Sequence, residues 1–138
     1  MSVRVDIDGL DELLRQMRRA PKETQAEVRD AAVEVAEDVA RDAAQRARGA
    51  SRQLAAVAPT FRAKRDRVPV VQAASARRET SSGAKAHEIF WGAEFGSDRL
   101  AQFPRRVKGG RSIYPAIEDN GEAAAEKYLR RIEGVFAR

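Results

Sequence analysis

Three carboxylates, Glu88, Glu94 and Asp98, lie near one predicted bend and form the one acidic cluster that could support paired-acid hydrolysis. Acids at turns and strand ends are far commoner than catalytic pairs, so we interpret these three as structural charges. His87 is the single histidine, and the chain has no cysteine. Multi-histidine metal sites, cysteine-bound zinc, thiol nucleophiles and disulfides are therefore excluded. We expect no catalytic, cofactor-binding or metal-binding residues and no enzyme activity; loss of an assayed activity on replacing His87 would indicate otherwise.

Two basic segments, RAKRDR at 62–67 and RRVKGGR at 105–111, could attract a polyanion. The net charge is +5, and most of the excess lies at residues 49–80. Such charge is either solvated loop charge or, repeated around a ring, the lining of a channel that passes DNA without reading bases. The candidates for a DNA channel or a loop between rings are Arg105, Arg106, Lys108 and Arg111. The glycine-containing bends GAEFG and KGGR match no nucleotide-binding fingerprint.

Four aromatic side chains lie within 14 positions just before this second basic segment, at Phe90, Trp91, Phe95 and Phe103. They are not interleaved with the basic residues, as the stacking platforms of single-strand binders are. The cluster is therefore interpreted as core, with an exposed aromatic edge for a partner protein as the alternative.

The elements that position these residues begin with a strand and two helices. Alternation of valine and isoleucine with polar residues predicts a strand over residues 2–7. Asp8 is expected to cap a short amphipathic helix that stops before Pro21. A second helix is predicted over residues 21–48, because Pro21 suits a first turn and no Gly or Pro follows it within that range.

The long helix carries an apolar stripe of small residues. At 1.5 Å per residue it extends about 42 Å, whereas a globule of this size is only roughly 37 Å across. Val, Leu, Ile and Phe together make up only about a fifth of the 138 residues, so large core side chains are scarce. We therefore expect neighbouring copies of the chain to cover the stripe. The predicted oligomer interface consists of Val28, Ala32, Val35, Val39 and Ala43.

The middle of the chain is expected to form the rest of a small sheet. A strand is predicted over residues 67–74, with Pro69 assigning it to a sheet edge or a bulge. Residues 75–86 are polar and small, as in a hairpin loop or tongue. A further strand is predicted over 87–92, followed by a long loop at about 95–112, and loops of that length are usually functional.

A closing helix is predicted from Tyr114-Pro115, with Asp119 as an alternative start. Glu126 and Arg130 have the spacing of a favourable ion pair within that helix. The expected fold is a single α+β domain over residues 1–138, with the long N-terminal helix and the C-terminal helix packed on a small, mostly antiparallel sheet.

Two stretches, VDIDGLDELLRQMRRAPKETQAEVRDAA and FWGAEFGSDRLAQFPRRVKGGRSIYPAIEDNGEAAAEKYL, resemble the small neck and tail-component family of long-tailed double-stranded DNA phages. This family comprises head-tail connector or tail-completion proteins, and the resemblance spans most of the chain except residues 49–86. The EFG bend and the downstream PAI are its most telling parts. The family's marked features, which we interpret as fold-defining, fall on Gly9, Leu10, Glu94, Phe95, Gly96, Pro115 and Ala116.

The resemblance implies a structural virion protein without catalysis or cofactors. It would form a homo-oligomeric ring of six- or twelve-fold symmetry between the capsid portal side and the tail, contact other phage connector and tail proteins, and let DNA pass with non-specific contact. It would reside in the neck or tail of the virion and, during assembly, in the host cytoplasm, with no membrane partner, since no signal peptide or membrane span is recognisable. A tail terminator ring capping the tail tube is one alternative, and a stand-alone basic nucleic-acid-binding protein is a second.

Overall fold

The computed structural model describes residues 2–74, 85–99, 102–103 and 106–137. Within them, five α-helices accompany a small three-stranded antiparallel sheet, so the predicted α+β class is confirmed. The elements in chain order are β1 (Ser2–Arg4), α1 (Leu10–Arg18), α2 (Lys22–Ala50), α3 (Arg52–Val57) with a 3-10 turn at Ala58–Thr60, β2 (Arg62–Lys64), β3 (Val70–Gln72), α4 (Ala86–Phe95) and α5 (Ile113–Phe136).

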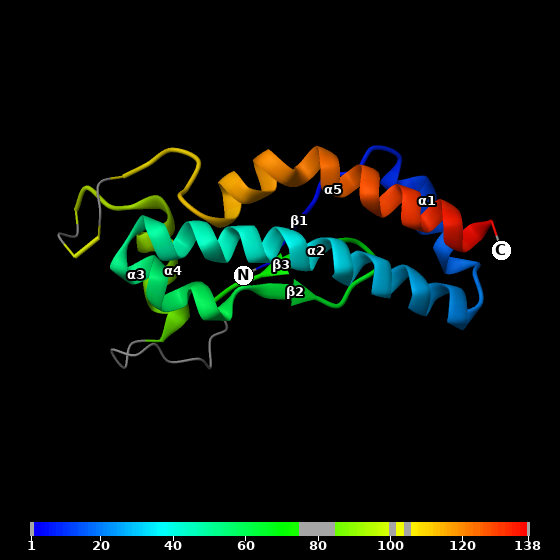
Figure 1. Cartoon of the computed structure of the whole chain (residues 1–138), viewed down its shortest axis with the longest axis horizontal. Helices are drawn as coiled ribbons and strands as arrows, with labels where there is room; N and C mark the ends of the chain where they lie inside the picture. The colour runs from blue at the N-terminus through cyan, green and yellow to red at the C-terminus, as the bar shows by residue number, and fades with distance from the viewer. Residues whose placement is uncertain (1, 75–84, 100–101, 104–105, 138) are drawn as a thin grey trace.

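The long helix α2 and the closing helix α5 lie side by side along the molecule (Figure 1). The predicted helix over 21–48 is confirmed, and it continues to Ala50 because Gly49 does not stop it. Ser51 then caps α3, where its Oγ accepts a hydrogen bond from the Leu54 N–H at 3.1 Å.

The first helix begins differently from the prediction. The side chain of Asp8 makes no capping bond, and the residue at the cap is Gly9, whose φ of 76° lies in the left-handed region. Glycine adopts that conformation without strain, so the turn is made by the backbone rather than by a side-chain cap.

The apolar stripe on α2 is covered by the chain's own elements. α5 packs along it and contributes the buried side chains of Ala116, Ala124, Tyr128 and Ile132, while β2 and β3 pack on another part of α2. The five stripe residues are at most 2% exposed, and they are Val28, Ala32, Val35, Val39 and Ala43. The prediction that copies of the chain cover this stripe was therefore wrong. Small side chains let two helices of one chain approach closely, and that accounts for the alanine content.

The sheet has the order β1-β3-β2, with both neighbours antiparallel to β3. Val71 is the central residue, paired with Val3 on one side and Ala63 on the other. Strands lie within both of the ranges 2–7 and 67–74, although each is only three residues long. Pro69 does not make β3 an edge strand; it precedes the strand, and its carbonyl accepts a hydrogen bond from the Val5 N–H at 3.0 Å.

The strand predicted over 87–92 was wrong, because these residues belong to α4. Its buried positions, Ala86, Phe90, Ala93 and Glu94, recur at helical spacing, whereas a short apolar run alone does not distinguish a strand from a buried helix. The third strand is β2, within the basic segment RAKRDR. The 75–86 prediction falls mostly outside the described residues, and its last two residues lead into α4.

The closing helix begins at Ile113, one residue before the predicted Tyr114. The described parts of the 95–112 segment contain no helix or strand after α4 ends, as predicted. Glu126 and Arg130 form no ion pair among the described residues, which corrects that prediction. Two other basic side chains of α5 form ion pairs with acids of α2. Lys127 Nζ lies 2.8 Å from Asp38, and Arg131 Nη1 lies 2.6 Å from Glu34.

Candidate functional site

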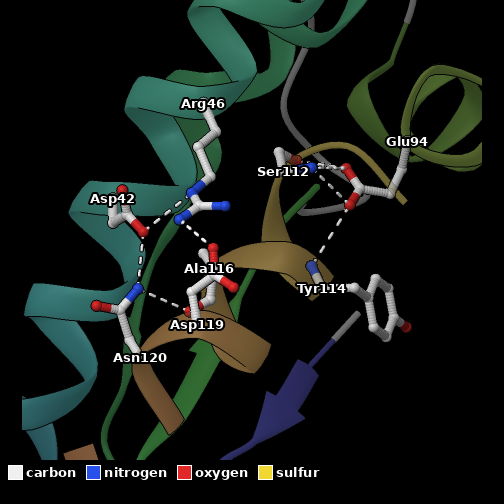
Figure 2. A network of polar contacts seen from close by, with 8 residues as sticks. All are labelled: Asp42, Arg46, Glu94, Ser112, Tyr114, Ala116, Asp119 and Asn120. Atoms are coloured by element: carbon white, nitrogen blue, oxygen red, sulfur yellow. Dashed lines mark hydrogen bonds and ion pairs between the residues drawn. The ribbon is translucent and has the colours of Figure 1, made fainter. Parts of the chain in front are cut away.

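The carboxylate of Glu94 joins the end of α4 to the beginning of α5 (Figure 2). Its side chain is fully buried. The backbone N–H groups of Ser112 and Arg111 donate to Oε1 at 2.9 and 3.2 Å, and the Ser112 hydroxyl donates to Oε2. The N–H of Tyr114 lies at the limit of hydrogen bonding, 3.5 Å from Oε1. The carboxylate therefore accepts hydrogen bonds from the residues that lead into α5, and its negative charge lies at the positive end of the helix dipole.

Gly110 makes room for this carboxylate. Its φ of 82° is in the left-handed region, and a Cβ built there would lie 2.6 Å from Glu94 Oε1. Gly109 also has a positive φ, of 88°. The KGGR bend therefore wraps the backbone around a buried acid, a structural role that its basic character did not indicate.

A row of aromatic rings continues from the core to the surface beside this junction. Phe90 is buried and meets Trp91 edge-on at 5.4 Å, Trp91 stacks on Phe95 at 5.8 Å, and Phe95 lies 5.2 Å from Tyr114, all between ring centroids. Trp91 is 51% exposed. Phe90 is thus core, as predicted for the cluster, whereas Trp91 provides the exposed aromatic edge that was the alternative.

The described part of the long loop is held against α4. The ring of Phe103 lies directly over Gly92, where a Cβ would be only 2.5 Å from it. The Val107 N–H donates to the Phe95 carbonyl at 2.7 Å, and Gln53 of α3 donates to the Gln102 carbonyl. A groove of about 670 Å³ results, and its lining includes Trp91, Phe95, Phe103, Arg99 and Arg106.

The predicted basic residues are divided by the structure. Arg106 and Lys108 are exposed, Arg111 is half-buried beside the Glu94 junction, and Arg105 lies outside the described residues. Among the described residues of this segment, Arg106 and Lys108 are therefore the exposed basic side chains, and Arg111 is not one of them.

The other basic segment, 62–67, is also divided. Arg62 and Lys64 point outward from the edge strand β2, and Arg65 is paired with Asp30 at 2.7 Å.

The predicted acidic cluster does not assemble into a catalytic pair. Glu88 takes part in the capping box of α4, where its Oε2 accepts from the Lys85 N–H at 3.3 Å, and Asp98 is exposed. Glu94 alone is buried, with hydrogen bonds that a helix cap requires. His87 is exposed in the first turn of α4.

The seven fold-motif positions lie at the ends of elements. Gly9 and Leu10 begin α1, and Gly96 ends α4 with a φ of 76°. Pro115 lies in the first turn of α5, where a missing N–H costs nothing, and Ala116 is buried there. Glu94 and Phe95 form the junction already described.

A second polar network joins α2 to α5 near this junction (Figure 2). Arg46 binds Asp42 at 3.0 Å and Asp119 at 2.7 Å, and the Asn120 amide donates to Asp42 at 2.7 Å. The Asn120 amide also donates to the Ala116 carbonyl at 2.7 Å. Further along, the hydrogen bond from Lys127 is the largest influence that lowers the pKa of Asp38.

The two tyrosines are buried to different extents. Burial raises the pKa of Tyr128 to about 12, and its hydroxyl donates to the Arg67 carbonyl. Burial, and secondarily the Glu94 carboxylate, also raises the pKa of Tyr114. Both phenols are therefore neutral at ordinary pH.

Two further searches of the described residues are negative. They contain no group of three or more acidic or histidine side chains placed to hold a metal ion. Among the helices as far as they are described, none combines the length and the apolar character needed to cross a membrane.

Comparisons with known proteins identify no relative. No protein-family model matches the chain, and neither a curated protein nor a solved structure is significantly similar to it.

Proposed function

We propose that the chain is a structural subunit of the head-tail connector of a long-tailed phage. Identical copies would form a ring between the portal side of the capsid and the tail, through which the genome passes. One observation carries this proposal. The two motifs on which the family resemblance depends most, the EFG bend and the PAI sequence, meet at one junction, where the buried Glu94 binds the start of α5.

This junction fits a protein that presents a loop to partners. The 95–112 segment is anchored at both ends, by α4 and by the Glu94 carboxylate, and its Phe103 is seated on Gly92. Anchoring lowers the entropy that a loop loses on binding. The neighbouring Trp91 is exposed, and tryptophan is among the residues that contribute most to protein interfaces.

The surface charge is compatible with DNA passing close by. Arg62 and Lys64 are exposed on β2. Attraction to phosphates needs no base-reading geometry, which suits a genome of any sequence passing through a ring.

The test is deletion of the gene from the phage genome that carries it, with complementation by a plasmid copy. We expect DNA-filled heads and finished tails that remain unjoined in electron micrographs, and rejoining on complementation. Normal particles without the protein would refute the proposal. Tails of irregular length would instead indicate the terminator alternative. Salt-dependent DNA binding by the isolated monomer, weakened uniformly by Arg106→Ala, would indicate the nucleic-acid-binding alternative.

A further inference from the structure

An acidic groove of about 450 Å³ runs between α5 and the segment that connects β1 to α1. Its floor includes the apolar side chains of Ile117, Ala125 and Leu129, all partly buried. Carboxylates line both rims. These are Asp6 and Asp8 on the connecting segment and Glu118, Glu122 and Glu126 on α5.

The carboxylates of the acidic groove are unpaired. Within the described residues none of the five makes an ion pair or a side-chain hydrogen bond, and no basic residue lines the groove. The three glutamates follow one another at four-residue spacing, so like charges are neighbours on one helix face and repel. The acids between α2 and α5 are different, since Glu34, Asp38 and Asp42 all have cationic partners. A cationic occupant with an apolar part would relieve the repulsion and cover the floor.

The chain itself carries a surface of the complementary kind, which we call the loop end. It consists of Trp91 on α4 and of Arg99, Arg106 and Lys108 on the following loop. All four side chains are exposed, and none of the three cations forms an ion pair with another described residue. Trp91 is the more exposed of the two large apolar side chains that stand out from the described surface; the other, Phe136, is 38% exposed.

The loop end and the acidic groove belong to different parts of the molecule. The groove beside Trp91 and the acidic groove share no lining residue. In Figure 1, α4 lies at one end of the long axis, whereas the segment between β1 and α1 passes α5 further along it. Each copy can therefore offer one surface and accept the other.

We propose that the acidic groove binds the loop end of a second copy of this chain. Trp91 covers the apolar floor while the cations of the loop meet the unpaired carboxylates. The inference rests on the proposed function, because it names the contact that would build the ring. A contact between two different surfaces is head-to-tail, and such contacts generate rings when the rotation between copies closes. DNA is disfavoured as an occupant, since the carboxylates repel phosphates.

The experiment reverses one charge on each surface and measures the mass of the assembly by sedimentation equilibrium at 50 mM and 500 mM salt. Glu122→Arg and Arg106→Glu each place like charges in the contact, and we expect each to weaken self-association at least about tenfold. Glu122→Arg mixed with Arg106→Glu should associate again, because each then meets an opposite charge. Glu133→Arg and Lys22→Glu are the matched controls, exposed and outside both surfaces, and should associate as the wild type does.

The outcomes separate this inference from the proposed function. The proposed contact is refuted if the wild-type protein remains monomeric at 1 mM in 50 mM salt. It is also refuted if the Glu122→Arg variant associates as tightly as the control variant Glu133→Arg. If a ring still forms with Glu122→Arg and with Arg106→Glu, the docking is refuted, whereas the connector role is not affected. The opposite result is also informative. If self-association is weakened by salt and restored by mixing the two variants, but deletion of the gene leaves the particles normal, the docking is supported and the connector role is refuted. Circular dichroism of each variant verifies the fold.

Discussion

Replacing Glu94 tests whether one buried carboxylate holds α4 to α5. Glu94→Ala removes the acceptor of the Ser112 N–H and hydroxyl, and Ser112 is itself fully buried, so water does not replace the lost partner. The Arg111 N–H loses its acceptor as well. Glu94→Gln keeps the shape and one carbonyl oxygen but removes the charge.

The expected loss of stability follows from the number of hydrogen-bond donors that the substitution leaves without an acceptor. Each buried donor without a partner costs about 1–3 kcal/mol, so two at Ser112 cost about 2–6 kcal/mol. Relief of the buried charge in Glu94→Ala offsets part of this. We expect a net loss of about 2–4 kcal/mol for Glu94→Ala. For Glu94→Gln we expect about 1–2 kcal/mol, because charge-assisted hydrogen bonds are roughly twice as strong as neutral ones.

The assay is urea unfolding followed by circular dichroism, with thermal melting as a second readout. A loss of about 2–4 kcal/mol corresponds to a fall in Tm of about 6–16 °C for a chain of this length. Glu133→Ala, which removes an exposed glutamate of α5, is the control and should change stability by less than about 0.5 kcal/mol. A Glu94→Ala protein as stable as this control would refute the assignment of Glu94 as the cap of α5.

Three other substitutions test neighbouring features. Gly92→Ala places a methyl group against the Phe103 ring, so we expect the ring to leave its seat, the fluorescence of the sole tryptophan to shift, and stability to fall by about 1 kcal/mol; an unchanged spectrum would contradict the packing. The pKa of Tyr128 is about 12 when folded, whereas an unfolded phenol titrates near 10. The contribution of the neutral phenol to the free energy of unfolding is therefore fully present below pH 10 and is lost as the pH rises through 12. Urea unfolding across that range should show a shallower decline for Tyr128→Phe, and equal slopes would refute the assignment. Val35→Asp puts a carboxylate between α2 and α5 and should cost more than about 3 kcal/mol in unfolding free energy, so an unaltered melting curve would show that the position is not buried.

The helices could be predicted where local rules and tertiary packing agree. α2 has no Gly or Pro before Gly49, and its small apolar residues recur at helical spacing, so its length was predicted to within two residues at each end. The covering of its stripe could not be predicted in the same way. The complementary face of α5 includes only one large aromatic, Tyr128, and its fit to α2 depends on how the two helices approach in space.

The sheet and the site were harder to derive, because their signals are short. The alternation of Phe61 and Ala63 with Arg62 and Lys64 marks β2, yet the positive charges dominated the interpretation of that segment. At the site, the EFG bend was singled out from the sequence, but the burial of Glu94 depends on Gly110, which is distant in sequence. A glycine pair that follows a basic loop is the one signal that could have indicated a close approach of the backbone.

The pairing of α2 with α5 also has a consequence for biosynthesis. About 60 residues separate the end of α2 from the beginning of α5. At roughly 5–20 residues per second, a ribosome needs several seconds to make the intervening segment. During that interval the part of the alanine and valine surface of α2 that α5 covers lacks its native partner, so it stays exposed until α5 has been made.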